Sequence, residues 1–530
     1  MSSKQIQRLI RSIVVMTVLL ASCSVMADTS GRYGGTLTVA MGSDLTTLDW
    51  MATTSSAPRM VMQHVFECLT SFDRELQVIP QLAETWEMGE GGKIWVFHLR
   101  PGVQYHGGYG EVTAEDVVAS WKRYLEVSPA AGSYSNMSAQ SAVALDSYTV
   151  QFTSTEPINL PVLLAEHPPL YIMPAEIILE NGVPRGPGSL SLEEYIGTGP
   201  FRITDYETGD HYTLERFDEY VPNDFEGSGL GGKRIAYLDR VIFKPIPEES
   251  ARLAGLETGE YDVIMAAPIG ELGRIENDPN LVPEPIYFAW LAMSFNTSKA
   301  PFDNITMRRA IQAALCEDEI MMAAGYNSEE FYDVDSSFFS TESAWHSDIG
   351  DEYYNQCNAE KAKALLEEAG YNGEPIKMIS NYSYPSHYRA SMVCLEQLTR
   401  IGLNIDFEVY DYTGMKALRA DYDYWDISFT SKSMRFDPYR NYSTWYGPNH
   451  KYNWAGEPEI DALIEQDMSN ILPFEERYAL LEQIQLLLHQ YVAPEIQLGK
   501  AYTLQARRAR VQGFDSWYLV RAWNVWLDDS

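Results

Sequence analysis

Segments that alternate apolar and polar residues recur along this chain, and segments with helical spacing lie between them. Residues 36–40 alternate with the period of a half-buried strand, whereas residues 58–69 place apolar side chains on one face of a helix. Further period-two segments are residues 95–99, 149–152, 212–216 and 237–243. The pattern predicts a mixed fold of helices and strands, and no internal repeat interrupts it.

The charge of the chain excludes one class of partner. Asp and Glu number 74 against 39 Lys and Arg, which gives a formal net charge of -35. An excess of this sign repels a phosphate backbone, so we expect no nucleic-acid partner. The acidic residues are scattered, which favours a solvated acidic surface. With 45% hydrophobic residues the chain is expected to fold, into about three domains at the usual domain size.

The N-terminus has the pattern of a targeting segment. Basic residues precede the apolar run 13–21, which suits the core of a signal peptide and is too short to span a bilayer. We expect residues 1–27 to be a signal peptide, cleaved after Ala27, and the protein to be periplasmic. Residues 20–23 resemble a lipobox, so a lipid anchor at Cys23 is the alternative.

The common motifs of catalysis and cofactor binding are missing from the sequence. There is no Gly-x-Ser-x-Gly, no His-Glu-x-x-His, no phosphate-binding loop, and no Gly-x-Gly-x-x-Gly after a strand. Histidines and cysteines lack the spacing of metal ligands. We expect no catalytic residue, no metal and no cofactor. A secreted hydrolase with paired carboxylates remains an alternative, because the fold decides how far apart two carboxylates lie.

A set of motifs carries a resemblance along nearly the whole chain. The first, Pro-Gln-Leu-Ala-Glu-Thr-Trp-Glu, begins at Pro80. The others begin, in order, at Trp95, Val112, Gly197, Pro245, Phe295, Ala359 and Glu459. Together they resemble the family 5 extracellular solute-binding proteins, the peptide/nickel-type receptors of ABC importers.

The resemblance implies a fold. It is the α/β, two-lobed periplasmic-binding-protein fold (type II, cluster C), with an extra subdomain inserted in the first lobe. The expected boundaries are 28–79, 200–287 and 498–530 for lobe I, 80–199 for the inserted subdomain, and 288–497 for lobe II. The chain would cross between the lobes near 287–294 and 497–503, where few residues must absorb any closure.

The resemblance also implies a function. A receptor of this kind captures an oligopeptide or dipeptide-like solute between its lobes and delivers it to an ABC importer permease in the inner membrane. It is not an enzyme, and we expect a monomer. The alternatives are a nickel-chelate or other small-solute receptor of the same fold, and an exported chaperone-like binder.

One loop holds the charged candidates for the ligand site. In peptide receptors of the family, an acidic residue beside an Asp-Pro segment binds the amino terminus of the ligand, and Asp437 stands at that place. Lys432, Arg435 and Arg440 crowd the same loop. Three interpretations remain open: a salt-bridge cluster, an amine anchor at Asp437, or a ligand carboxylate bound by Arg435 or Arg440.

Aromatic and small residues complete the predicted site. Trp290 matches the segment where the family's chain enters lobe II, so it is predicted to face the ligand, with core packing as the alternative. Weaker candidates lie in segments predicted to be loops, which the family places at the mouth of the cleft: Ser56, Ala57, Trp445 and Trp454.

A disulfide is predicted between Cys316 and Cys357. An exported chain folds where thiols are oxidised, and the family places the helices beside these two cysteines in the same lobe. Cys68 belongs to the other lobe, and Cys394 lies on a packed helix face. The alternative is four free buried cysteines, because a bridge needs a Cα separation of about 4.4 to 6.8 Å.

Overall fold

The computed structural model describes residues 32–166, 168–433, 435–446, 457–467, 471–492 and 494–528. The described residues from Gly34 onward form one compact unit. The predicted signal peptide and Cys23 lie outside the described residues. In the part of the chain that is described, no helix has the length and apolar character to cross a membrane.

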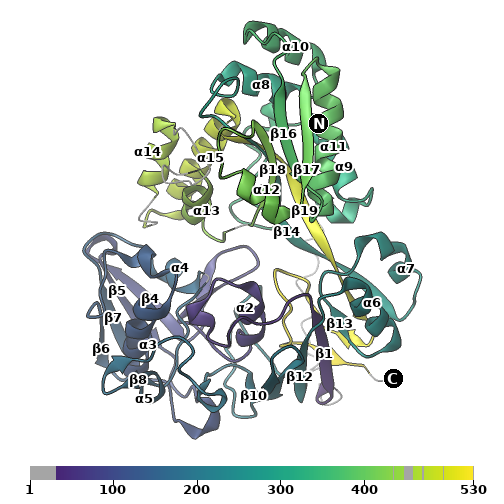
Figure 1. Ribbon diagram of the computed structural model, residues 1–530. Coiled ribbons are helices and arrows are strands. Elements are labelled where there is room, and N and C mark those ends of the chain that lie inside the picture. Colours follow the sequence, from purple (N-terminus) through teal and green to yellow (C-terminus); the bar gives the residue numbers. More distant parts are fainter. Residues whose placement is uncertain are drawn as a thin grey trace, which may run out of the picture. The chain divides into compact units, whose positions relative to one another are not determined.

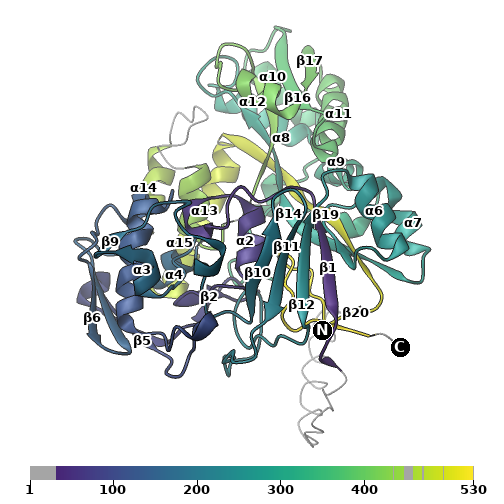
Figure 2. The same ribbon diagram turned by 60° about the horizontal axis from the view of Figure 1, so that its bottom comes forward.

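Among the described residues, 11 strands form one mixed sheet (Figure 1). Its first half is made of β10 (Phe201–Glu207), β11 (His211–Arg216), β12 (Arg240–Pro245), β1 (Thr36–Met41) and β13 (Val263–Ile264). Figure 2 shows β10, β11, β12 and β1 side by side. The second half of the sheet is made of β18 (Ile427–Lys432), β16 (Ile376–Asn381) and β17 (Ile405–Tyr410). Between the halves lie β19 (Glu495–Arg508) and β14 (Leu281–Phe295), and β15 (Tyr332–Asp333) also pairs with β19. The prediction of a mixed α/β fold is confirmed.

Strands β14 and β19 connect the two halves. They pair antiparallel from Leu281 with Arg508 to Ser294 with Glu495. At one end β19 pairs with β13, and at the other β14 pairs with β18. The crossings expected near 287–294 and 497–503 fall inside these strands, so the two halves are held together by the same long ladder.

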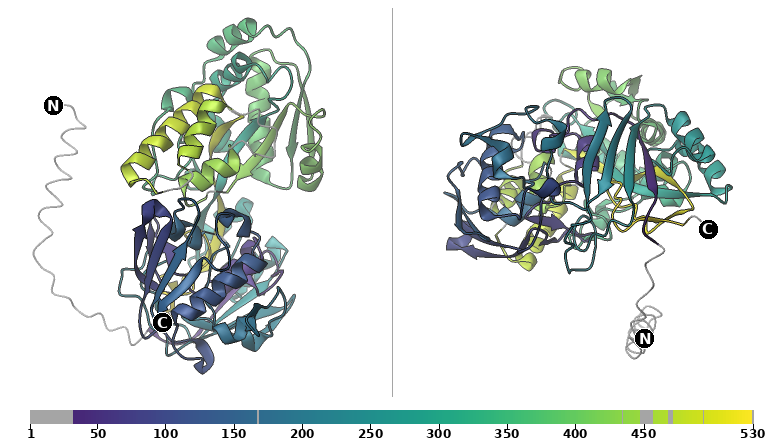
Figure 3. Two further views of the ribbon diagram at one scale, coloured as in Figure 1. Left: turned by 90° about the vertical axis from the view of Figure 1, so that its left-hand side faces the viewer. Right: turned by 90° about the horizontal axis from the view of Figure 1, so that it is seen from below.

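A separate four-stranded sheet lies within residues 80–199. It is antiparallel, in the order β4 (Ala83–Gly89), β5 (Ile94–Leu99), β7 (Thr149–Thr153) and β6 (Ala142–Asp146). Helix α3 (Ala114–Val127) packs on it through Trp121, whose ring meets Phe152 edge-on at 5.5 Å; Figure 3, left, shows this helix in blue against the strands. Thr113 is the N-cap residue of this helix, and its N–H donates to Asp116 at 2.9 Å.

Alternate residues of β14 enter two different cores. Leu291, Met293 and Phe295 pack under α8 (Ile305–Ala314), α9 (Glu317–Ala324), α10 (Ala359–Glu368) and α11 (Pro385–Arg400). Trp290 and Ala292 pack under α13 (Pro438–Trp445), α14 (Pro458–Gln466) and α15 (Phe474–Tyr491). Figure 1 shows α9 and α11 on one side of the strands and α13, α14 and α15 on the other. The near-continuous apolar run of β14 therefore reflects burial on both faces.

The remaining elements are short. The helices are α2 (Ser56–Met62), α4 (Leu160–Ala165), α5 (Ala175–Ile178), α6 (Glu249–Thr258), α7 (Leu272–Glu276) and α12 (Tyr412–Leu418). The strands are β2 (Thr70–Phe72), β3 (Val78–Pro80), β8 (Leu179–Glu180), β9 (Val183–Pro184), β20 (Val511–Gln512) and β21 (Trp526–Leu527).

Helix α2 is shorter than predicted. It ends at Met62, whereas the periodicity predicted a helix to residue 69. The carbonyls of His64 and Val65 instead accept the N–H groups of Phe201 at 3.1 Å and Gly199 at 2.9 Å. A Cβ at Gly199 would clash with the His64 carbonyl, which explains a glycine in the motif that begins at Gly197. A tertiary contact therefore replaced the last helical turns.

Candidate ligand-binding site

The segment 435–446, between β18 and the end of α13, is where the two halves of the protein meet. Phe436 packs edge-on against Phe72 at 5.1 Å and against Tyr518 at 4.8 Å, both from segments outside the second half. Its backbone N–H donates to Glu166 Oε1 at 3.2 Å. Half of the predicted site residues lie in this segment, so the structure places those four at the junction.

Asp437 lies in a buried salt-bridge cluster. Its Oδ2 is 2.9 Å from Arg477 Nη2, and its Oδ1 accepts the backbone N–H of Arg440 at 3.4 Å as the N-cap of α13. Arg477 Nε also donates to Asp467 at 2.7 Å. Burial raises the pKa of Asp467 to about 6. Any ammonium group that approached Asp437 would have to share it with Arg477.

The two arginines of the segment approach the first half. Arg440 Nη1 donates to Ser133 Oγ at 3.1 Å, and the Arg435 guanidinium lies 6.0 Å from the centre of the Trp445 ring. Nε of each arginine is buried with no hydrogen-bond partner among the described residues. Burial raises the pKa of Glu166, and the positive charges of Arg440 and Arg435 oppose that rise. Each of these two arginines can therefore donate a further hydrogen bond at the junction.

The aromatic candidates fall into different places. Trp290 is fully buried, with its ring 5.9 Å from Phe338 and 6.5 Å from Trp445, which agrees with the core-packing alternative. Trp445 is half-buried and ends α13, so the prediction that it lies in a loop is wrong. Trp454 lies outside the described residues. Trp290 and Trp445 are in contact, and only Trp445 borders a cavity described below.

Ser56 and Ala57 begin α2, and the prediction that they lie in a loop is also wrong. Their neighbour Arg59 makes the contact to the segment. Its guanidinium lies 5.7 Å from the Phe436 ring centre, and Nη1 donates to Tyr518 at 3.0 Å. Arg59, Glu166 and Arg477 were not predicted as site residues. Arg59 could have been, because it is a charged residue inside an apolar helical stretch; no sequence pattern points to Glu166 or Arg477.

A cavity of about 190 Å³ opens beside Trp445. Its wall includes Lys432, whose ammonium group pairs with Glu495 at 2.5 Å while both side chains are almost fully buried. Tyr446 donates to the same Glu495 oxygen at 2.8 Å. The remaining lining comes from Ser294, Phe295, Tyr412, Lys416, Arg419, Thr430, Ser431 and Pro494. This cavity belongs to the second half and adjoins the segment 435–446 through Trp445.

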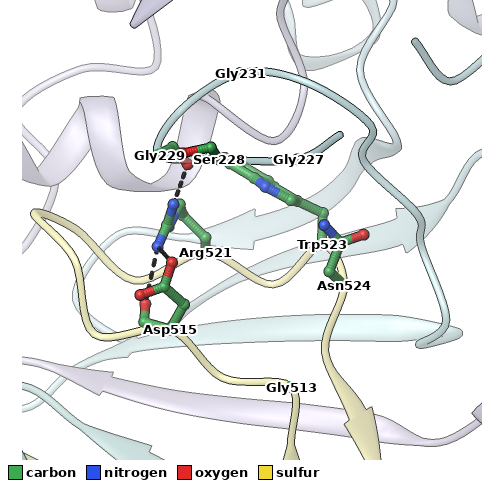
Figure 4. A pocket seen from close by; sticks show the side chains of 9 residues that line it. All are labelled: Gly227, Ser228, Gly229, Gly231, Gly513, Asp515, Arg521, Trp523 and Asn524. Carbon is green, nitrogen blue, oxygen red and sulfur yellow. Dashed lines mark hydrogen bonds and ion pairs between the residues drawn. The ribbon is translucent and has the colours of Figure 1, made fainter. Parts of the chain in front are cut away.

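A second cavity, of about 210 Å³, lies in the first half (Figure 4). Arg521 crosses it, donating to the Gly229 carbonyl and pairing with Asp515. Asp515 also pairs with Arg74, which reaches Glu342 of the second half at 3.2 Å. Arg521 and Asp515 thus form an ion pair inside this cavity. None of the predicted site residues lines it.

The structure joins Cys316 and Cys357 by a disulfide, with their Cα atoms 4.6 Å apart. Cys68 and Cys394 are buried free thiols, and burial raises the pKa of Cys68 to about 12. Across the described ranges, no group of three or more His, Cys, Asp or Glu side chains is arranged to hold a metal ion.

Residues 77–453 match the family described as bacterial extracellular solute-binding proteins, family 5. The chain belongs to this family, as the motifs predicted. It is 29% identical over 527 residues to a probable peptide ABC transporter periplasmic-binding protein of Sinorhizobium fredii, covering 96% of each chain. It is 27% identical to the heme-binding protein A of Haemophilus influenzae, covering 85% of this chain and 84% of that one.

Solved structures have the same fold. The periplasmic binding protein DppA of Helicobacter pylori, in complex with the peptide STSA, superposes with a TM-score of 0.69 at 23% identity, over 94% of this chain and 99% of that one. The predicted two-lobed α/β fold is confirmed. The first and second halves described above are the two lobes. These relatives are binding proteins, not enzymes.

Proposed function

We propose that the protein is exported to the periplasm, captures a small peptide-like solute between its lobes, and delivers it unchanged to the permease of an ABC importer. The observation that carries the proposal is the junction at segment 435–446, where buried donors from both lobes converge. The names of the relatives support a peptide or a heme as solute. The lobe boundaries and the monomeric state stated above form part of the proposal.

The mechanism we propose is closure on the ligand. Among the described residues, the chain passes between the lobes through the two strands β14 and β19, so the lobes can rotate about them. A solute that touches both lobes binds the closed form better and shifts the population toward it. Trp290, Trp445, Ser56 and Ala57 remain candidates that line the closed cleft, together with the charged residues of the segment.

Recovery of bound solute tests the function. Purified protein is incubated with a pool of metabolites and peptides, and the retained compounds are identified by mass spectrometry. We expect unaltered peptides and a smaller radius of gyration in solution scattering at saturating solute. A chemically altered compound with turnover would favour the hydrolase, and metal that survives dialysis would favour the nickel-chelate receptor. Either result, or an unchanged radius, would contradict the proposal.

A further inference from the structure

We propose that segment 435–446 binds a carboxylate of an acidic solute. This takes the place of the alternative in which Asp437 binds the amino terminus of a peptide. The inference rests on the proposed function and names the chemical class of its solute. Three observations support it: the buried polar atoms without a partner at the junction are donors, the junction is locally positive, and Asp437 is already paired with Arg477.

The unsatisfied polar atoms of the segment are donors. Among its described residues, the buried side-chain atoms without a hydrogen-bond partner are Arg435 Nε, Arg440 Nε, Asn441 Nδ2, Trp445 Nε1 and the hydroxyl of Tyr442. No carboxylate or amide oxygen is in that set. The Asn441 oxygen already accepts the Arg435 N–H at 3.4 Å, which leaves its amide nitrogen to donate. Buried donors need acceptors, and a carboxylate offers two oxygens with several lone pairs.

The first lobe adds a further donor from the opposite side. Arg59 is buried in α2, its guanidinium faces the Phe436 ring, and its Nε has no partner among the described residues. Three arginines thus approach one carboxylate, Glu166, which uses Oε1 to accept the Phe436 N–H. The junction is locally positive in a chain whose net charge is -35. An anion gains from this arrangement, because the buried site screens charges less than water does.

The acidic residue of the segment is already neutralised. Asp437 pairs with Arg477 and caps α13, and the second carboxylate on Arg477 is that of Asp467. An ammonium group would have to compete with a buried guanidinium at 2.9 Å. A solute carboxylate would share Arg435 and Arg440 with Glu166, on which both positive charges act. The two guanidinium groups otherwise contact Trp445 and Ser133.

Peptides blocked at one end distinguish the two recognition modes. An equimolar pool of di- to pentapeptides is offered in three forms: free, amidated at the C-terminus, and acetylated at the N-terminus. We expect amidation to reduce retention at least about tenfold, because the charge-assisted hydrogen bonds to the carboxylate are lost. Acetylation should change retention less than about threefold. Equal retention of the amidated and free pools, or loss of the acetylated pool alone, would overturn the inference and leave the receptor function standing.

Variants of Arg435 and Arg440 test whether these residues cause the preference for a free carboxylate. Arg435→Gln with Arg440→Gln should abolish the preference for free over amidated peptides, whereas Arg400→Gln, on the exposed face of α11, should preserve it. Because the double variant changes buried groups, Arg435→Lys and Arg440→Lys are made in parallel, and each should keep part of the preference. An unchanged preference in all of these folded variants would refute the site. If none of the three pools and no acidic metabolite is retained by the unaltered protein, the proposed function fails, and this inference fails with it.

Discussion

Phe436 donates its backbone N–H to the buried carboxylate of Glu166, although 270 residues of sequence separate the two. The contact joins the loop after β18 to Glu166, the C-cap residue that follows α4. Three arginines lie around the same carboxylate, so Glu166 is both a link between the lobes and the negative charge that partly balances the junction.

Replacing that charge should strengthen anion binding. Glu166→Gln keeps an oxygen that can accept the Phe436 N–H and removes the negative charge that would repel a solute carboxylate. We expect the affinity for a retained acidic peptide, measured by isothermal titration calorimetry at pH 7, to rise severalfold. Glu156→Gln, at an exposed position nearby in the sequence, is the control and should leave the affinity unchanged. A weaker affinity in the Glu166 variant would contradict the charge argument.

Arg477 should be critical for stability. It neutralises the buried carboxylates of Asp437 and Asp467, so Arg477→Met leaves two uncompensated charges. Removing one partner of a buried ion pair costs about 3 to 5 kcal/mol, which urea unfolding can measure. Arg400→Met breaks the surface pair with Glu396 and should cost less than about 1 kcal/mol. Similar costs for the two variants would show that the cluster contributes no more than a surface pair.

The disulfide should be found in protein taken from an oxidising compartment. Cys316 and Cys357 are separated by 41 positions, and a closed loop of that length stabilises by roughly 4 kcal/mol in the chain-entropy model. Non-reducing peptide mapping should yield one linked peptide, and reduction should lower the melting temperature. The variant Cys394→Ala should respond to reduction as the unaltered protein does. Free thiols at both positions would refute the bridge.

Glu317, next to that disulfide, should make stability depend on pH. Burial raises its pKa from the ordinary 4.5 to about 8. The folded state therefore holds the proton more tightly than the unfolded chain, so the stabilisation is full below about pH 4.5 and is lost as the pH rises through about 8.

Glu317→Gln keeps the side chain neutral and removes that loss. We expect this variant to melt at a higher temperature than the unaltered protein at pH 8 and to differ little at pH 4.5. The control is Glu367→Gln, at an exposed position of α10, which should follow the unaltered protein at both pH values. A variant that melts lower at pH 8 would show that the carboxylate is stabilised as an anion.

Local sequence determined the elements that depend on periodicity and end signals. The capping residues Thr113 and Asp116 set the start of α3, and Gly370, in the left-handed region at φ 76°, follows the end of α10. These features depend on neighbours within a few residues, so the chain reveals them without its fold. The ordered motifs likewise identified the family and, through it, the two-lobed fold.

Tertiary structure decided what the site residues do. The sequence located Asp437, Arg435 and Arg440. Arg477, which forms an ion pair with Asp437, comes 40 positions later on another helix. Glu166 and Arg59 reach the junction from the other lobe. Helix α2 stopped at Met62 because the strand that begins at Phe201 supplied other hydrogen bonds. The groups packed around a buried side chain determine its protonation state and which of its hydrogen-bond donors and acceptors stay unpaired. Most of those groups are distant in sequence.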